Sequence, residues 1–131
     1  MKYDKRIIES DPVGLARKGA EIFSKAATKS VEKRGRFVVA ISGGSTPRDM
    51  HRTLGEEPFR SNIPWENTNI FWVDERCVPE NDPAGNYVAA RADFIDRVPI
   101  PEAQVYPMQC EGSPEYGAIQ YNLWTMRDGH K

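Results

Sequence analysis

The segment from Arg36 to Met50, RFVVAISGGSTPRDM, decides the fold of this chain. It opens with Phe37–Ile41, five apolar residues that include two valines and an isoleucine, which is the length and composition of a buried strand. Two glycines follow the apolar run. Thr46 followed by Pro47 then indicates an N-cap and a first helical residue, because the N–H group that proline lacks would have no partner there. The segment is therefore predicted to be a strand, a glycine-rich turn and a helix.

The turn Ser42–Thr46 has the features of an anion site. Free backbone N–H groups would lie at the positive end of a helix dipole, and glycines allow an anion to come close. The alternative is an ordinary strand-to-helix turn, in which Gly, Ser and Thr are common. The turn is neither a Walker loop, since no lysine follows the glycines, nor a dinucleotide fingerprint, since the glycine spacing differs. The residues alone leave an anion site and an ordinary turn both open.

A charged triplet, Asp74-Glu75-Arg76, directly follows a second buried run at Ile70–Val73. In a functional interpretation the planar guanidinium of Arg76 clamps an anion, while the two acids position Arg76 or contact hydroxyl groups. In the alternative interpretation the triplet is a solvated loop that contains a local ion pair. The triplet by itself does not separate these interpretations.

Predicted strands and helices alternate along the whole chain. The further predicted elements are a strand at 3–10, a helix at 12–33 stopped by Gly35, a helix at 47–54, a polar connector at 55–68, a helix at 86–97, a short strand at 105–106 and a last helix from 113. The apolar runs have no polar alternation, so both faces of the sheet are expected to be covered. We therefore expect a single α/β domain over residues 1–131, a Rossmann-like parallel sheet with helices on both faces. The glycine turn Ser42–Thr46 and the charged triplet Asp74–Arg76 then both lie at the carboxyl ends of strands, where such sheets bind ligands.

The composition argues against large charged partners. Lys and Arg number 18 and Asp and Glu 19, so the net charge of −1 gives no general case for nucleic acid or an anionic membrane. The charged first residues predict neither a signal peptide nor a membrane span. Cys77 and Cys110 are interpreted as two reduced thiols of a cytoplasmic protein. His51 is interpreted as a surface or packing residue, and Trp65 and Trp72 as core residues.

Together these residues resemble the 6-phosphogluconolactonase family. Its signatures are a Ser/Ala-Gly-Gly-Ser/Arg-Thr-Pro turn, a tryptophan, an apolar strand ending in Asp-Glu-Arg, a Val-Pro pair and a Ser-Asn pair. The chain matches them in order at Ser42–Pro47, Trp65, Asp74–Arg76, Val78–Pro79 and Asn86. Glucosamine-6-phosphate deaminases of the same superfamily tend to carry Asp-Glu-Tyr instead, so Arg76 favours the lactonase.

The resemblance implies hydrolysis of 6-phosphogluconolactone to 6-phosphogluconate in the pentose phosphate pathway, with a small sugar phosphate as partner and without a metal or cofactor. The dianionic phosphate of the substrate would explain why an apolar strand runs into glycines and hydroxyl groups. The substrate-binding residues that the resemblance implies are Ser42, Gly43, Gly44, Ser45, Thr46, Asp74, Arg76 and Asn86.

The chain departs from the family in two places. Gly85 stands where the family usually has a serine before Asn86. The resemblance also covers only the N-terminal half of the family, which continues into a strand ending in Leu-Gly-Met-Gly and then Asp-Gly-His, whose histidine is the general base. His130 follows Asp128-Gly129 here, but residues 123–127 do not read as a buried strand, so His130 is not expected to act as the base. No catalytic residue is therefore identified.

A truncated or alternatively terminated member of the family would carry half a parallel sheet. Such a sheet exposes an apolar face and an unpaired edge, through which we expect self-association. Four hypotheses stay open: a lactonase, a catalytically inactive sugar-phosphate-binding fragment, a deaminase-like protein, and a module that completes a site with another chain.

Overall fold

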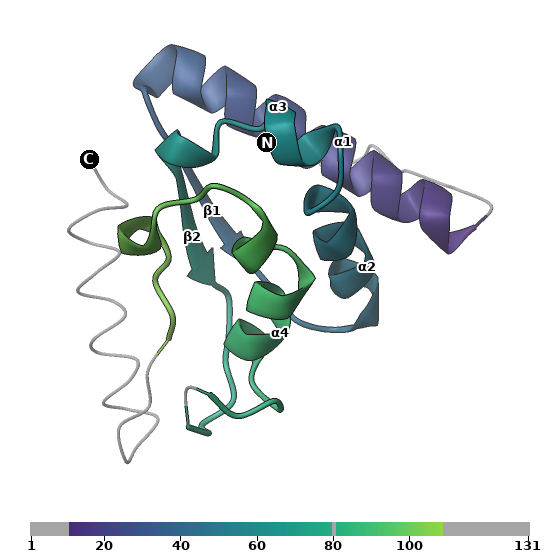
Figure 1. The fold of residues 1–131 in the computed structure, drawn as a ribbon, viewed down its shortest axis with the longest axis vertical. Coiled ribbons are helices and arrows are strands. Elements are labelled where there is room, and N and C mark those ends of the chain that lie inside the picture. Colours follow the sequence, from purple (N-terminus) through teal and green to yellow (C-terminus); the bar gives the residue numbers. More distant parts are fainter. Residues whose placement is uncertain (1–10, 80, 109–131) are drawn as a thin grey trace, which may run out of the picture.

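The structure is a computed structural model of the 131-residue chain, and it describes residues 11–79 and 81–108. Its elements are α1 (Pro12–Arg34), β1 (Phe37–Ile41), α2 (Ser45–Leu54), α3 (Phe59–Asn62), β2 (Thr68–Trp72) and α4 (Asn86–Asp93), with 3-10 turns at Trp65–Asn67, Ile95–Arg97 and Glu102–Gln104 (Figure 1). The predicted strand at 3–10, the predicted helix from 113, Cys110 and His130 lie outside the described residues.

Helix α1 begins and ends where the sequence predicts. The Asp11 carboxylate accepts a hydrogen bond from the Gly14 amide at 2.7 Å, which caps the first turn. At the other end Gly35 adopts a left-handed conformation with φ 77°, and its amide donates to the Val31 carbonyl at 2.8 Å. Both ends are thus set by local chemistry, and the predicted helix is confirmed.

The predicted parallel sheet is also confirmed. Strand β1 pairs with β2 in parallel, with Phe37 opposite Thr68 and Ile41 opposite Trp72. Val105 forms a parallel bridge to Ile70, so β2 lies between β1 and this short extended segment. Within residues 11–79 and 81–108, no strand pairs with the outer edge of β1.

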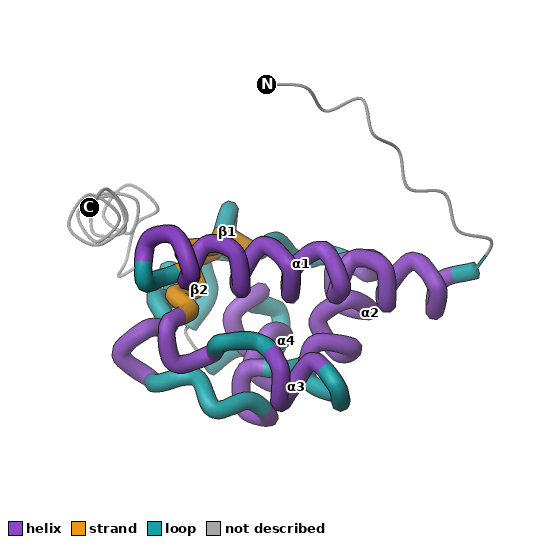
Figure 2. Tube along the Cα trace, turned by 90° about the horizontal axis from the view of Figure 1, so that it is seen from above, coloured by secondary structure: helices purple, strands orange, loops and turns teal. Residues whose placement is uncertain are grey.

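The core lies on one face of this sheet. Phe37, Val39 and Ile41 point toward it from β1, and Ile70 and Trp72 point toward it from β2. The helices α1, α2 and α4 supply the rest of the core, and Figure 2 shows α2, α3 and α4 together on one side of the long α1 helix. The two tryptophans predicted as core residues, Trp65 and Trp72, are both buried.

The opposite face of the sheet is covered only in part. Val38 and Ala40 of β1 are exposed, whereas Phe71 of β2 stacks on Tyr106 with ring centroids 4.4 Å apart. Among the residues that the structure describes, the helices therefore pack on one face only, and the helices expected on the second face are not among them.

Several predicted boundaries differ from the structure. The second strand covers Thr68–Trp72 rather than Ile70–Val73, and Val73 is exposed. Helix α2 begins at Ser45 because Gly44, with φ 110°, takes the N-cap position, so the prediction of Thr46 as N-cap is wrong. Helix α4 ends at Asp93 rather than at residue 97, since Phe94 leaves helical geometry at φ −153°. The connector at 55–68 contains α3 and buries apolar residues, among them Phe59, and is therefore part of the core.

The structure also bears on the cysteines and on membrane insertion. Cys77 is disulfide-bonded, so the expectation of reduced thiols is wrong for this residue. The helices in the described part of the chain include none with the length and apolar character needed to cross a membrane.

Candidate functional site

The glycine turn Ser42–Thr46 and the triplet Asp74–Arg76 lie at the same end of the sheet, where the strands have their carboxyl ends. The glycine turn follows β1 and the Asp74–Arg76 loop follows β2, and both strands run in the same direction (Figure 1). The Val73 amide donates to the Ile41 carbonyl at 2.8 Å, so the two strands diverge only after this hydrogen bond. The carboxyl ends of parallel strands thus bring the stretches together, as predicted.

The glycine turn presents unused hydrogen-bond donors. The first backbone bond of α2 runs from the Arg48 amide to the Gly44 carbonyl at 3.1 Å. Within the described part of the chain, no acceptor pairs with the amides of Gly43, Gly44, Ser45 and Thr46 or with the hydroxyls of Ser42, Ser45 and Thr46. Most of these residues are exposed, so the donors are available to an anion at the start of the helix.

Glu75 holds the start of α4. Its carboxylate accepts hydrogen bonds from the amides of Asn86 at 2.6 Å and Tyr87 at 2.8 Å. The same carboxylate accepts from the amide of its neighbour Arg76 at 2.8 Å. Glu75 is therefore committed to the backbone, a role that the sequence analysis did not assign to it.

Asn86 joins the loop after β2 to the glycine turn. Its side-chain Nδ2 donates to the backbone carbonyl of Asp74 at 3.2 Å and to the Asp74 carboxylate at 3.3 Å. The same side chain lies against Gly43, where an added Cβ would sit 2.7 Å from the Asn86 Cγ. With Asn86 in this position only glycine fits at position 43. Asn86 thus contacts two other predicted site residues, Asp74 and Gly43.

Arg76 is exposed, and its guanidinium forms no ion pair with any carboxylate among the described residues. The interpretation of the triplet as a local ion pair is therefore wrong. The reason is geometric, because Glu75 turns to the α4 amides and Asp74 turns to Asn86.

A cluster that the sequence analysis missed lies beneath the turn. The Asp93 carboxylate, only 4% exposed, accepts from Arg48 Nε at 2.9 Å and Nη2 at 3.1 Å, and Arg52 Nε lies 3.4 Å away. The hydrogen bond to Asp93 raises the pKa of Arg48. The i, i+4 spacing of the two arginines on a predicted helix was the available signal, but nothing local indicated their partner on α4.

His51 is a packing residue, as predicted. It is 3% exposed, and its ring centroid lies 5.2 Å from that of Phe94. Burial lowers the pKa of His51 to about 4. The described residues contain no group of three or more His, Cys, Asp or Glu side chains that could hold a metal ion.

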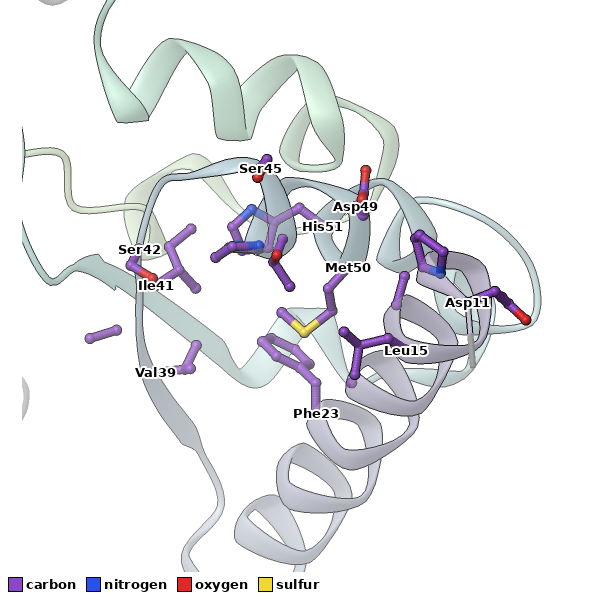
Figure 3. Close-up of a pocket in the computed structure, with 16 residues that line it drawn as sticks. Asp11, Leu15, Phe23, Val39, Ile41, Ser42, Ser45, Asp49, Met50 and His51 are labelled. Atoms are coloured by element: carbon purple, nitrogen blue, oxygen red, sulfur yellow. The ribbon is translucent and has the colours of Figure 1, made fainter. Parts of the chain in front are cut away.

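A cavity of about 770 Å³ lies between α1, β1 and α2. Its walls are mostly apolar and include Leu15, Phe23 and Met50, and its lining continues to Ser42 and Ser45 of the glycine turn (Figure 3). The unused donors therefore border an apolar hollow along β1.

Comparison with known proteins agrees with this geometry. Residues 10–128 match the family of glucosamine-6-phosphate isomerases/6-phosphogluconolactonase. The chain is 39% identical over 109 residues to a probable chloroplastic 6-phosphogluconolactonase 4 of Oryza sativa subsp. indica, covering 83% of this chain and 32% of the relative. It is 39% identical over 95 residues to the 6-phosphogluconolactonase of Synechocystis sp., covering 72% of this chain and 38% of that protein.

A solved structure shows the same fold. The 6-phosphogluconolactonase from Shewanella baltica superposes with a TM-score of 0.79 at 23% identity, over 92% of this chain and 50% of that one. The chain thus spans about a third of the length of these two curated relatives and half of this solved structure. The extent of the family match and the identity to these relatives together show that the chain belongs to the family of glucosamine-6-phosphate isomerases and 6-phosphogluconolactonases.

Proposed function

We propose that the protein acts on 6-phosphogluconolactone, opening it to 6-phosphogluconate in the pentose phosphate pathway, and that this chain carries the phosphate-binding part of the site. The observation that carries the proposal is the row of donors at Gly43–Thr46, which find no acceptor among the described residues. Asn86 links them to the loop of Arg76, whose guanidinium has no carboxylate partner in the same part of the chain. A dianionic phosphate needs several donors and a positive charge, and both are supplied here. The names of the rice and Synechocystis relatives support this substrate.

The proposed roles follow from which groups are free. The amides and hydroxyls of Ser42–Thr46 hold the phosphate, and Arg76 adds charge from the neighbouring loop. Asp74 contacts a sugar hydroxyl with the carboxylate positions that Asn86 leaves open. Asn86 acts mainly by holding Asp74 and the turn in place, because its Nδ2 is already used.

Lactone hydrolysis also needs a base to accept a proton from water and donors for the developing oxyanion. His51 is a poor base at neutral pH, since it is buried against Phe94 and its pKa is lowered to about 4. Glu75 is occupied by three amides. We therefore place the base outside the described residues. We expect residues 1–131 alone to open the lactone no faster than its spontaneous hydrolysis.

A chimera tests the proposed function. The chain would be joined at residue 108 to the remaining C-terminal part of the Synechocystis relative, and lactone opening would be followed beside the 131-residue chain. We expect the chimera to raise the rate well above the spontaneous one, and the Arg76→Ala chimera to lose most of this rate. An inactive chimera that still binds 6-phosphogluconate would favour the alternative of a binding fragment without catalysis.

The same chimera separates the lactonase from a deaminase-like protein, because the family name covers both classes. Glucosamine 6-phosphate would be offered in place of the lactone, with ammonia release as the readout. Arg76, at the position where deaminases tend to carry tyrosine, leads us to expect no ammonia. Ammonia release without lactone opening would contradict the lactonase proposal.

We propose that the activity is in the cytoplasm. A phosphorylated sugar lactone is charged, and it is therefore consumed in the compartment where it is formed. The rice relative is named chloroplastic, so a plastid is the alternative. A fluorescent fusion of the full-length protein in its own cell would separate the two compartments.

We also propose that two copies of the chain associate through the outer edge of β1. That edge lacks a strand partner among the described residues, and Val38 beside it is 38% exposed. Unpaired edges recruit further strands, and a lysine on such a strand opposes pairing. Sedimentation should show a concentration-dependent dimer for the wild type and a monomer for Val38→Lys, whereas a wild-type monomer at every concentration would contradict this proposal.

A further inference from the structure

We infer that Glu75 is a positioning residue, whose carboxylate replaces the missing side-chain cap of α4 and thereby holds the Asp74–Arg76 loop beside the glycine turn. The capping role stands on the hydrogen bonds alone. Its consequence, that Arg76 is left for the substrate phosphate, rests on the proposed function.

The start of α4 has no side-chain cap from its own N-cap residue. Its N-cap is Gly85, which has no side chain to accept a hydrogen bond, so the first amides of the helix need another acceptor. Glu75 supplies both of its oxygens, Oε1 to the amide of Asn86 and Oε2 to the amide of Tyr87. A carboxylate at this position also matches the positive end of the helix dipole. A residue eleven positions away in sequence therefore caps the helix.

The space around Gly85 is limited by Glu75 and Asp82. A Cβ added to Gly85 would lie 3.4 Å from Glu75 Oε2 and 3.3 Å from the Asp82 carbonyl. With φ −82°, Gly85 does not need glycine for backbone reasons. Glycine at this position instead leaves room for the Glu75 carboxylate.

The cap at Glu75 also fixes the geometry of the candidate site. Glu75 also binds the Arg76 amide, so one carboxylate joins the loop after β2 to α4. Asn86, held by that same carboxylate, donates to Asp74 and packs on Gly43. With both acids turned toward α4, neither neutralises Arg76. Glu75 thus sets the position of the loop relative to the turn without touching the substrate.

Two variants test this inference in the 131-residue chain: Glu75→Gln, and the same variant with Gly85→Ser. Hydrogen exchange of the Asn86 and Tyr87 amides in the free protein reports the cap, and titration with inorganic phosphate reports the site. We expect Glu75→Gln to lower the protection of each of the two amides about tenfold and to weaken phosphate binding about tenfold. Each effect is the equivalent of one lost hydrogen bond to a charged group. Gly85→Ser should restore protection at Tyr87, since serine caps helices, but not phosphate affinity.

The outcomes separate the claims. Unchanged protection in Glu75→Gln would overturn the cap, and restoration of both protection and affinity by Gly85→Ser would overturn the positioning role. If wild type bound no phosphate, the proposed function would fail while the exchange data still judged the cap. Should Glu75→Gln not fold, Glu75→Asp keeps the charge but is one methylene too short to reach both amides, and the same two outcomes apply to it.

Discussion

Arg48 and Asp93 form a two-pronged ion pair that joins α2 to α4, with Nε and Nη2 of the arginine 2.9 and 3.1 Å from the two carboxylate oxygens. The helix that begins at the glycine turn is thereby fixed to the helix that Glu75 caps. The ion pair therefore fixes the relative position of the two loops of the candidate site, which are attached to these two helices.

Removal of Arg48 is expected to destabilise the fold. Arg48→Met leaves the buried Asp93 carboxylate with only the longer contact to Arg52, and we expect a loss of about 1.5–3 kcal/mol in the free energy of unfolding. Urea denaturation measures this loss. Arg60→Met is the matched control, because Arg60 pairs with Glu57 on the exposed surface and its loss should cost under about 1 kcal/mol. Equal losses in the two variants would show that the ion pair to Asp93 adds no more stability than an exposed pair.

A methyl group at position 43 is expected to disrupt the contact with Asn86. Gly43→Ala places a Cβ 2.7 Å from the Asn86 Cγ, so the Asn86 side chain has to move and gives up its hydrogen bonds to Asp74. We expect a loss of about 1–3 kcal/mol of stability, in the range of other overpacked sites. The double variant Gly43→Ala/Asn86→Ala should recover part of the loss, since the overlapping amide is gone. No recovery in the double variant would mean that the glycine is required for another reason.

Much of the fold could be predicted because its signals are local. The apolar run Phe37–Ile41, the cap at Asp11 and the left-handed Gly35 each act within a few residues. The errors arose where tertiary contacts decide. The composition of residues 55–68 predicts a polar connector, although Phe59 packs into the core. Helix α4 ends before its predicted end because buried Phe94 leaves helical geometry.

For the candidate site, too, the location of the residues could be predicted but their contact partners could not. Its place at the carboxyl ends of the strands follows from the topology, so Ser42–Thr46 and Asp74–Arg76 could be located from the sequence. Their partners could not. The bond from Asn86 to Glu75 and the pair of Arg48 with Asp93 join residues 11 and 45 positions apart, and no local pattern specifies such contacts.

His51 should make the stability of the protein depend on pH. Its pKa is lowered from 6.5 to about 4, so between these values the unfolded chain binds a proton that the folded chain does not. Stability from the neutral ring is complete above pH 6.5 and is lost as the pH falls toward 4, by about 3 kcal/mol. Denaturation at pH 7 and pH 4 measures the difference. His51→Phe keeps a ring against Phe94 but binds no proton, and an equal fall in this variant would exclude His51 as the cause.

Arg76→Ala should weaken binding of 6-phosphogluconate by about 1.5–3 kcal/mol, the range for a hydrogen bond to a charged group. The reason is that its guanidinium has no carboxylate partner among the described residues and is free to meet a phosphate. Calorimetric titration would measure the change. Arg60→Ala removes the same charge from α3, away from the glycine turn, and should leave the affinity unchanged. Equal affinities for wild type and Arg76→Ala would show that Arg76 does not bind the phosphate.

The most direct test of the phosphate site is an NMR titration of the labelled 131-residue chain with 6-phosphogluconate and, separately, with gluconate, which lacks the phosphate. The amides of Gly43, Gly44, Ser45 and Thr46 have no acceptor among residues 11–79 and 81–108. Their signals should shift with 6-phosphogluconate and saturate, and they should stay in place with gluconate. Amides that do not move with 6-phosphogluconate, or that move equally with gluconate, would contradict the assignment of this turn as the phosphate-binding part of the site.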